Sequence, residues 1–561
     1  MRRKPNILFI NLMSTPYNEL ISRFENRSIS VEKFWDENLS MPSGLMYLSS
    51  YIKKYSSPDR VGFLDYNIKA KNLNDYNNLE EFILHNARNS IDFKPDILAV
   101  SLNMSTSHHF YLVAVKILKA LWPDVITVAG GNHATNYARI LLLDENTDYI
   151  IRGEGEIPLA EFIKLYSEGK EINIKGVYSK NNISVDELDT AEFIDDLDII
   201  PFPDWDIIEM ESYITGINRI PAVGEHHKKQ RRMAGIITTR GCPFRCTFCS
   251  SHTVHGRKVR YRSVQNIIDE IKILHQKYGV TDYFLEDDLC TANKERAMSL
   301  LSELQKLNIK DFELHIPNGL SIKTLDEELM DKLVETGLNI ATLAIESGSE
   351  YVQKHIIKKQ VDLNKAKDIV KYLRKKKIIV SAFFILGFPG ETREQMAESV
   401  EYAKELDADW YHIFVATPLA GSEMYKEFVE MGAIKELDVD VWTRAFYKER
   451  LFDIPYITAD ELNDIAYRAN LECNFFSNPN MLNGRYEMAI TLFERIIKKY
   501  HFHIIAWYCL MHCYINLNNQ DKADIIRDEI AKIISNDERA ASMYKKYSDR
   551  MPGLNGIVLN K

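Results

Sequence analysis

Six repeats of a strand, a turn and a helix follow one another between residues 235 and 415. The strand candidates are the apolar runs Gly235–Thr239, Asp282–Glu286, Phe312–Ile316, Ile340–Ile345, Val380–Leu386 and Trp410–Val415. The helical patterns between them lie at Val264–Tyr278, Lys294–Lys306, Asp326–Glu335, Leu363–Lys376 and Arg393–Leu406. Parallel strands with helical crossovers close readily into a barrel, and barrel enzymes place their chemistry at the carboxyl ends of the strands. We therefore predict a partial (β/α)6 barrel with a site at that end.

A second alternation of strands and helices occupies the first two hundred residues. The strand candidates are Ile7–Asn11, Val61–Asp65, Asp96–Ser101, Val125–Ala129 and Asp148–Ile151, and helical patterns lie near Ser43–Lys54, His108–Leu121 and Ala134–Leu143. This order predicts a parallel sheet wrapped by helices, which binds ligands at the carboxyl ends of its strands. Small and polar residues gather at those ends, namely Ser43, Gly44, Asp65, Ser101, Gly130, Gly131, Gly153 and Glu154. Each glycine taken singly could also serve an ordinary turn.

From about Ile457 the pattern becomes helical and a 34-residue period appears. Ala489 and Ala523 are separated by this period, as are Cys473 and Trp507. The pattern resembles one to two tetratricopeptide repeats. Because about three repeats are needed for independent stability, we expect this helical unit to pack on the barrel.

Length and composition limit the class of protein. The chain has 561 residues, a formal net charge of −10 and seven cysteines. An odd, small number of cysteines argues for reduced thiols rather than a disulfide scaffold. No apolar stretch approaches the length of a membrane span, and basic residues are not gathered in a way that favours nucleic acid. We expect a cytoplasmic protein with neither a nucleic-acid partner nor a membrane span.

Four segments are predicted along the chain. Residues 1–194 form the first α/β domain, and the linker 195–231 follows, which is rich in Pro and Asp near residues 201–206. Residues 232–456 form the barrel, and residues 457–561 form an all-α C-terminal domain.

Three cysteines stand close together at the end of the first barrel strand. Cys242, Cys246 and Cys249 have the spacing Cys-x3-Cys-x2-Cys, with Pro, Arg and Thr among the residues between them. Thiolates bind soft transition metals, and iron–sulfur clusters prefer them. Spacing alone favours a cluster with an incomplete set of protein ligands. Zinc takes a fourth ligand, so a Cys3His zinc site that uses His252 or His255 is the alternative.

Residues 232–430 resemble the core of the radical S-adenosylmethionine (radical SAM) superfamily, whose cysteine signature this loop matches without substitution. The resemblance implies that the three cysteines hold a 4Fe–4S cluster. It also implies that the amino and carboxylate groups of S-adenosylmethionine (SAM) occupy the fourth iron, which explains the missing ligand. His252 and His255 then become loop residues.

Further motifs match this superfamily in its order. The resemblance implies contacts to SAM from residues in "FLEDD", "AIESGS" and "GFPGE", namely Asp287, Asp288, Glu346, Ser347, Gly387, Gly390 and Glu391. Relatives often carry an arginine near the end of the third strand, where this chain has Pro317-Asn318-Gly319. Cys290 is close enough in sequence to Asp288 to be a catalytic candidate, although a lone cysteine is more often a small buried hydrophobe.

Residues 5–170 resemble the Rossmann-like cobalamin-binding domain that precedes many radical SAM enzymes. The resemblance rests on Pro42-Ser43-Gly44, "VAGGNH" at 128–133 and "RGEGE" at 152–156, and it assigns the eight strand-end residues given above to cobalamin. Relatives that ligate cobalt carry Asp-x-His-x-x-Gly where this chain has Asp65-Tyr66-Asn67-Ile68-Lys69-Ala70. Two alternatives therefore remain for this domain. It binds cobalamin without a protein imidazole, or it keeps the fold but has lost cobalamin.

The resemblance implies a radical SAM enzyme that generates a 5′-deoxyadenosyl radical. The leading hypothesis is a cobalamin-dependent methyltransferase acting on an unactivated carbon or phosphorus centre. The alternatives are a radical SAM cyclase, rearrangement or epimerisation enzyme without methyl transfer, and a non-catalytic zinc-binding scaffold. The expected partners are a small-molecule or peptide substrate, an electron donor such as flavodoxin or ferredoxin, and a protein partner at the C-terminal helices.

Overall fold

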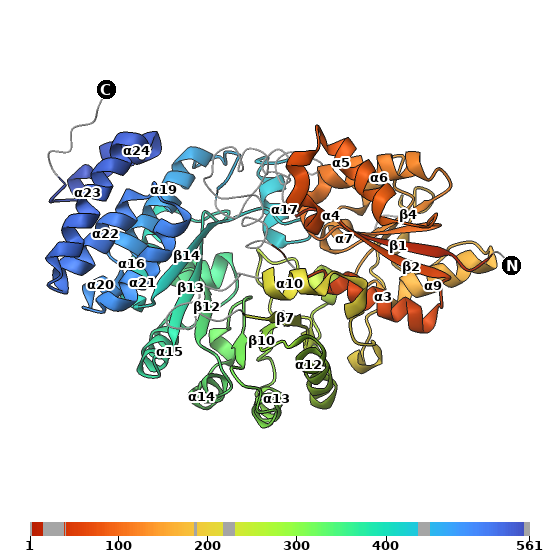
Figure 1. The fold of residues 1–561 in the computed structure, drawn as a ribbon, viewed down its shortest axis with the longest axis horizontal. Coiled ribbons are helices and arrows are strands. Elements are labelled where there is room, and N and C mark those ends of the chain that lie inside the picture. Colours follow the sequence, from red (N-terminus) through yellow and green to blue (C-terminus); the bar gives the residue numbers. More distant parts are fainter. Residues whose placement is uncertain are drawn as a thin grey trace.

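The chain forms three parts that follow one another across the molecule. The computed structural model describes residues 3–14, 39, 41–184, 188–216, 231–435 and 449–554. Figure 1 shows the N-terminal sheet domain on the right, the barrel in the lower centre and the C-terminal helices on the left. Residues 217–230 of the predicted linker lie outside the described residues.

A six-stranded sheet organises the N-terminal part, in the order β2-β1-β3-β4-β5-β6. The strands are β1 Asn6–Asn11, β2 Arg60–Asp65, β3 Ile97–Ser101, β4 Ile126–Gly130, β5 Tyr149–Ile151 and β6 Val177–Tyr178. Only β6 runs antiparallel to its neighbour among these strands. The five predicted strands are confirmed, and the order is that of a Rossmann-like sheet with a crevice beside β1 and β3.

Alternation along β1 divides the core of this domain into two layers. Leu8 and Ile10 pack with the helices α5 (Leu79–Ser90) and α6 (His108–Leu121). Ile7 and Phe9 pack on the other face with α3 (Ser43–Tyr55) and α9 (Glu156–Glu168). Successive side chains of a strand point to opposite faces, so both faces of this strand are apolar and covered.

The predicted helix Ala134–Leu143 is interrupted. The structure instead has two short helices, α7 (Asn132–Asn136) and α8 (Ala138–Leu141). Before α7, Gly131 has a φ of +106°, and a Cβ there would collide with the side chain of Asn103. Only glycine allows the chain to turn this close to the end of β3.

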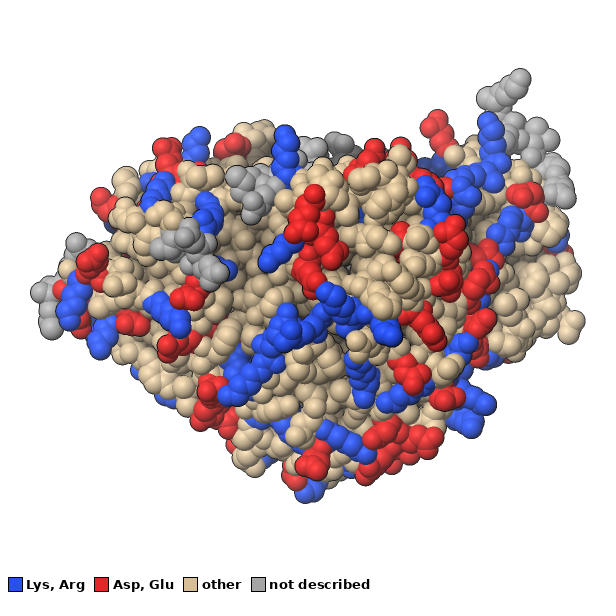
Figure 2. Space-filling model, turned by 180° about the vertical axis from the view of Figure 1, so that it is seen from behind, with Lys and Arg blue, Asp and Glu red and all other residues tan. Residues whose placement is uncertain are grey.

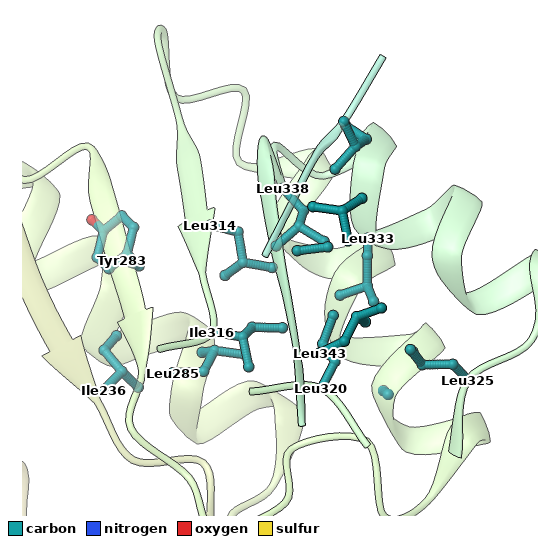
Figure 3. Packing of buried hydrophobic residues seen from close by; sticks show 14 of the residues in the cluster. Ile236, Tyr283, Leu285, Leu314, Ile316, Leu320, Leu325, Leu333, Leu338 and Leu343 are labelled. Atoms are coloured by element: carbon teal, nitrogen blue, oxygen red, sulfur yellow. The ribbon is translucent and has the colours of Figure 1, made fainter. Parts of the chain in front are cut away.

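Six parallel strands build the barrel in sequence order. They are β7 Met233–Ile236, β10 Asp282–Leu285, β11 Glu313–His315, β12 Ile340–Glu346, β13 Ile379–Leu386 and β14 Trp410–Val415. They form two three-stranded sheets, and single bridges pair Leu314 with Leu338 and Leu320 with Leu343 where the sheets meet. Figure 3 shows these leucines side by side within the barrel core.

The five predicted barrel helices are present on the outside of the sheet. They are α12 Val264–Tyr278, α13 Lys294–Lys306, α14 Glu327–Glu335, α15 Leu363–Lys375 and α16 Arg393–Leu406. The first predicted strand, Gly235–Thr239, was wrong in its extent. β7 ends at Ile236, and Thr239–Arg240 forms a separate strand, β8, which pairs antiparallel with β9 (Arg260–Tyr261).

The C-terminal part is helical, as predicted. Its main helices are α19 Ala459–Leu471, α21 Tyr486–Lys499, α22 Ile504–Asn516, α23 Gln520–Asn536 and α24 Glu538–Tyr547. Ala489 and Ala523, which are one 34-residue period apart, are both fully buried in one core. The likeness to tetratricopeptide repeats stays a prediction. No helix in the described part of the chain is long and apolar enough to span a bilayer.

One asparagine docks these helices on the barrel. Asn474, which is fully buried, accepts a hydrogen bond from the backbone N–H of Tyr411 in β14 and donates one to its carbonyl, each at 2.8 Å. Beside it, the rings of Trp410 and Phe475 lie 5.7 Å apart. The side chain therefore replaces a neighbouring strand at the edge of the sheet.

We expect Asn474→Leu to destabilise this junction by about 2–4 kcal/mol, because it leaves a buried N–H and a buried C=O of Tyr411 unpaired. The melting temperature should fall and amide hydrogen exchange at Tyr411 should accelerate. The control is Asn483→Leu, which removes an exposed hydrogen bond to Asp407 and should cost under about 0.5 kcal/mol. Equal effects of the two variants would contradict this role.

Candidate functional site

The cysteine loop is fastened at both ends. At its start, the carboxylate of Asp288 accepts hydrogen bonds from the Gly241 N–H at 3.0 Å and from the Ser251 hydroxyl at 2.5 Å. Further along, the Thr247 N–H donates to the Ile357 carbonyl at 3.2 Å, and the Met424 N–H donates to the Thr247 carbonyl at 2.9 Å. These bonds join the loop to three separate segments of the barrel.

The three cysteines share one partly buried space. Burial raises the pKa of all three thiols, that of Cys246 to about 11, and each thiol feels the positive charge of Lys359. Thiols in such a site stay protonated until a metal displaces the protons.

The cysteines do not form a closed metal site as they stand. Among the described residues, neither the cysteines alone nor the cysteines with His252 or His255 form a set of three ligand atoms that all lie within 4.8 Å of one another.

The acidic residues after β10 diverge. Asp288 holds the cysteine loop, whereas Glu286 faces the N-terminal domain, where the Ser43 hydroxyl lies 3.4 Å from its carboxylate. Asp287 accepts hydrogen bonds from the N–H and hydroxyl of Thr238, both at 2.5 Å, and from the Thr239 N–H at 2.8 Å. Burial raises the pKa of Asp287 to about 6. Its carboxylate is thus engaged with the break between β7 and β8 rather than directed to a ligand.

Sequence reasoning missed Lys359. Its ammonium forms a 2.6 Å ion pair with Glu346, which ends β12 in a left-handed conformation with φ of +75°. Both side chains are largely buried beside the cysteines. A π-helical turn (Val352–Ile356) precedes Lys359, and no helical or strand period in the sequence indicates that the chain turns back there.

A cavity of about 430 Å³ lies between the N-terminal sheet and the barrel. Seven of the eight predicted strand-end residues line it, namely Ser43, Gly44, Ser101, Gly130, Gly131, Gly153 and Glu154. Ile237, Arg240, Val254, His255 and Glu286 line it from the barrel side. The cavity therefore lies at the carboxyl ends of the strands of both the N-terminal sheet and the barrel.

The cavity suits a flat ligand with amide groups. A Cβ built on Gly44 would meet no atom within 4 Å, and one on Gly130 would meet its nearest at 3.8 Å. The side chains of Asn11, Asn67 and Asn103 add amide groups to the wall. A corrin ring, which carries amides around its edge, fits such a glycine-floored cradle.

The comparisons with known proteins identify both domains. Residues 236–403 match the family model of the radical SAM superfamily, and residues 37–163 match that of the B12 binding domain. Cytidylyl-2-hydroxyethylphosphonate methyltransferase from Streptomyces wedmorensis is 28% identical over 77% of this chain and 86% of its own length. An uncharacterized methyltransferase of Pyrococcus horikoshii is 29% identical over 70% of this chain and 80% of its own.

The chain is a radical SAM enzyme with a B12-binding domain.

Solved structures agree with this assignment at the level of the fold. The radical SAM methyltransferase TsrM from Kitasatospora setae, with cobalamin and a 4Fe–4S cluster bound, has a TM-score of 0.57 at 17% identity, over 77% of this chain and 79% of its own. The cobalamin-dependent radical enzyme OxsB has a TM-score of 0.62 at 14% identity, over 98% of this chain and 84% of its own. The radical SAM domain implies a 4Fe–4S cluster and SAM as cofactors of this enzyme, and the B12-binding domain implies cobalamin.

Two of the predicted SAM-binding side chains, those of Ser347 and Glu391, form hydrogen bonds within the protein. The hydroxyl of Ser347 lies 3.0 Å from that of Ser399 in α16. Glu391 is buried and accepts hydrogen bonds from the N–H groups of Gly387 at 2.6 Å and Phe388 at 3.0 Å. Burial raises the pKa of Glu391 to about 8.

The turn from Gly387 to Gly390 is braced by residues that follow the barrel. The Gly390 N–H donates to the hydroxyl of Tyr456, and a Cβ on Gly387 would collide with Leu462 of α19. The ring of Phe388 lies 5.9 Å from that of Phe248 in the cysteine loop. The fifth-strand motif thus connects the cysteine loop with the C-terminal helices.

Two other candidates lie away from the cavity. Asp65 does not line it, because its carboxylate accepts hydrogen bonds from Asn11, from the Asn67 N–H and from the Tyr213 hydroxyl. Burial raises the pKa of Asp65 to about 6. Cys290 packs against the barrel core, and burial raises its pKa well above that of an ordinary thiol, which disfavours a thiolate nucleophile. Asp65 is best described as the cap of the short helix after β2.

A second group of metal-binding side chains lies at the start of β10 and along β11. Asp282, Glu313 and His315 are buried with their ligand atoms within 4.8 Å of one another. Arg231 enters the same group, 2.5 Å from Glu313 and 3.4 Å from Asp282. Since a guanidinium already supplies positive charge there, we interpret this group as a buried ion-pair cluster.

The B12-binding and radical SAM domains are joined by buried ion pairs. Glu154 accepts two hydrogen bonds from the guanidinium of Arg260, at 2.7 and 2.8 Å, and Glu156 accepts one from Arg240 at 2.6 Å. Although burial opposes it, hydrogen bonds from His255 and Arg260 hold the pKa of Glu154 well below its usual range. The predicted cobalamin residue Glu154 is therefore also an interdomain clamp.

We expect Glu154→Gln to destabilise the protein by about 3–5 kcal/mol, because it leaves Arg260 buried beside a neutral amide. The measurement is the melting temperature with and without added cobalamin. Glu168→Gln, which removes an exposed pair with Lys170, should leave the melting temperature almost unchanged. If Glu154 acted only through cobalamin, the variant would melt like the wild type in the absence of cobalamin.

Proposed function

We propose that this radical SAM enzyme is a cobalamin-dependent methyltransferase that acts on an unactivated carbon or phosphorus centre. The observation that carries the proposal is the 430 Å³ cavity between the glycine-lined sheet and the barrel, next to the cysteine loop. Arg240, which lines this cavity, directly precedes Gly241 and Cys242. Similarity to the Streptomyces wedmorensis methyltransferase supports the reaction class.

Each cofactor would be held by residues of this chain. Cys242, Cys246 and Cys249 would ligate the 4Fe–4S cluster, and Lys359 would pair with the carboxylate of SAM. Glu346, released from Lys359, would face the amino group of SAM. When bound, the reduced cluster supplies the electron that cleaves SAM, and cobalamin supplies a methyl carrier. The protein positions these groups and excludes water from them.

Cobalamin would bind without a protein imidazole from the loop after β2. Asn67 occupies the position at which cobalt-ligating relatives have histidine, and its amide donates to the Leu12 carbonyl at 2.7 Å. Ser43, Gly44, Gly130, Gly131 and the peptide at Gly153 would form the floor of the cradle.

The substrate would sit in a second, smaller cavity of about 100 Å³. Asn103 and Met104 line both cavities, and Ser250, the neighbour of Cys249, lines the smaller one. A substrate placed there would adjoin both the cluster loop and the cobalamin cradle. Asn132, Asn136 and Thr417 make its wall polar.

The domain boundaries and partners follow from the same proposal. We place the B12-binding domain at residues 1–194, the linker at 195–231, the radical SAM domain at 232–456 and the helical domain at 457–561. A small-molecule or peptide substrate and an acidic electron carrier such as flavodoxin or ferredoxin are the proposed partners, with a further protein at the C-terminal helices. Seven free cysteines and an oxygen-sensitive cluster support a reducing cytoplasm as its location.

We expect Lys359→Met to weaken SAM binding by about tenfold to a hundredfold, because one charge-assisted hydrogen bond is lost. The measurement is the Kd for SAM of the reconstituted enzyme. Lys359→Arg should recover part of the affinity, and the control Lys358→Met, whose ammonium pairs with Glu423 on the surface, should bind SAM normally. Unchanged affinity in Lys359→Met would remove Lys359 from the site.

Anaerobic reconstitution tests the reaction itself. The enzyme with iron, sulfide, cobalamin and SAM should show a 4Fe–4S spectrum, and Cys246→Ala should lose it. With SAM labelled in its methyl group and cytidylyl-2-hydroxyethylphosphonate as first substrate, a methyltransferase forms 5′-deoxyadenosine, S-adenosylhomocysteine and labelled product. A cyclase or other radical enzyme forms 5′-deoxyadenosine without S-adenosylhomocysteine. One zinc per chain and no 5′-deoxyadenosine would exclude both.

A further inference from the structure

Charge is unevenly distributed over this acidic chain, whose net charge is −10. Figure 2 shows Lys and Arg side chains gathered into a band across the centre of one face, with Asp and Glu clustered beside it. Local groups of basic residues therefore need their own explanation, since net charge does not predict them.

One such group surrounds Phe244, which stands between the first two cysteines of the loop. Arg257 donates a hydrogen bond to the Phe244 carbonyl at 2.6 Å. The ammonium of Lys323 lies 5.3 Å from the centre of the Phe244 ring, and Arg245 follows Phe244 directly in the chain. Arg245, Arg257 and Lys323 are exposed. We call these four residues the basic edge.

The cations of the basic edge have no acidic partner in the part of the chain that the structure describes. None of Arg245, Arg257 and Lys323 makes an ion pair there. Other exposed lysines near the loop do have acidic partners. Lys258 pairs with Asp195, and Lys358 pairs with Glu423. Lys323 and Arg257 contact Phe244, but none of the three cations has an acidic partner among the described residues, so their positive charge stays uncompensated there.

The basic edge also lies apart from the substrate side of the loop. None of its residues lines the 430 Å³ cavity or the 100 Å³ cavity. The cavity walls come instead from Arg240, Ser250, Val254 and His255. Arg240 and Ser250, which flank the cysteine loop, thus face the cavities, whereas the three cations of the basic edge are exposed to solvent.

We propose that the basic edge is the docking surface for an acidic one-electron carrier protein. This inference rests on the proposed function, in which the three cysteines hold a cluster that must be reduced by one electron. Phe244 is part of the ligand loop, so a carrier seated on it delivers its electron close to the cluster. The carrier's reduced cofactor loses one electron and the cluster gains it, with no bond formed or broken.

The charges suit a brief encounter of this kind. Complementary charge raises association rates by about 10 to 10³ at low ionic strength, and weak electron-transfer complexes bury little area. Phe244 supplies an apolar centre, and the three cations form the polar rim of such a small interface.

The test is stopped-flow reduction of the reconstituted full-length enzyme by reduced flavodoxin, followed by bleaching of the cluster absorbance. We expect Arg245→Glu/Lys323→Glu to lower the second-order rate at least tenfold at low salt. The difference from the wild type should shrink as ionic strength rises, because salt screens exposed charges. Arg257 is left in place because it supports the loop backbone. With dithionite, a small reductant, the variant should form 5′-deoxyadenosine at the wild-type rate.

Lys371→Glu/Lys375→Glu is the matched control. It reverses two exposed lysines of α15 that make no ion pair in the described part of the chain, on a helix that leads to the amino end of β13. This variant should accept electrons from flavodoxin like the wild type.

Three results would overturn the inference. The first is reduction of the Arg245→Glu/Lys323→Glu variant by flavodoxin as fast as the wild type, and the second is an equal slowing of the Lys371→Glu/Lys375→Glu control. A raised KM for substrate with dithionite would assign the basic edge to an anionic substrate instead. Failure of the wild type to form 5′-deoxyadenosine with dithionite would reject the proposed function itself, and is thereby distinguished from failure of the docking surface.

Discussion

The site depends on one buried carboxylate, that of Asp287. By accepting three hydrogen bonds from Thr238 and Thr239, it stabilises the point at which the first barrel strand stops and the chain changes direction. The short strand β8 that follows sends Arg240 toward the B12-binding domain and the cysteine loop toward the barrel. Asp288, the next residue, then holds the start of that loop through Gly241. Two adjacent acids at the end of β10 thus organise the entire first turn of the barrel.

Much of the fold could be predicted because apolar periodicity is a local property. The helices α12, α13 and α16 and the strand β14 have the bounds that periodicity predicts. The errors occur where distant contacts decide. The first strand is broken because Asp287, about fifty residues away, binds its end. The predicted helix after β4 is also broken. It lies in a segment where Gly131 is close to Asn103 at the end of β3, and no periodicity in the sequence indicates that contact.

The sequence predicts which residues gather at the candidate site but not where their side chains point. The cysteine spacing and the glycines at strand ends are motifs that survive in the linear sequence, and seven of eight cradle residues do line the cavity. Which way a polar side chain points depends on its neighbours in space. The side chains of Asp65, Ser347 and Glu391 form hydrogen bonds with neighbouring protein groups, and that of Glu154 also pairs with Arg260. Lys359 was missed because a π-helical turn brings it back beside Glu346.

The bracing of the Gly387–Gly390 turn has a consequence for how the chain can vary. Tyr456 and Leu462 support this turn from beyond the last barrel strand, and Asn474 completes the edge of β14. The helical part is therefore a wall of the catalytic barrel rather than an attachment to it. Insertions that preserve activity should accumulate at the far end of this part, beyond α21, whereas the segment from Tyr456 to Asn474 should change together with the barrel. An exchange of C-terminal regions between relatives would have to cut the chain after that segment.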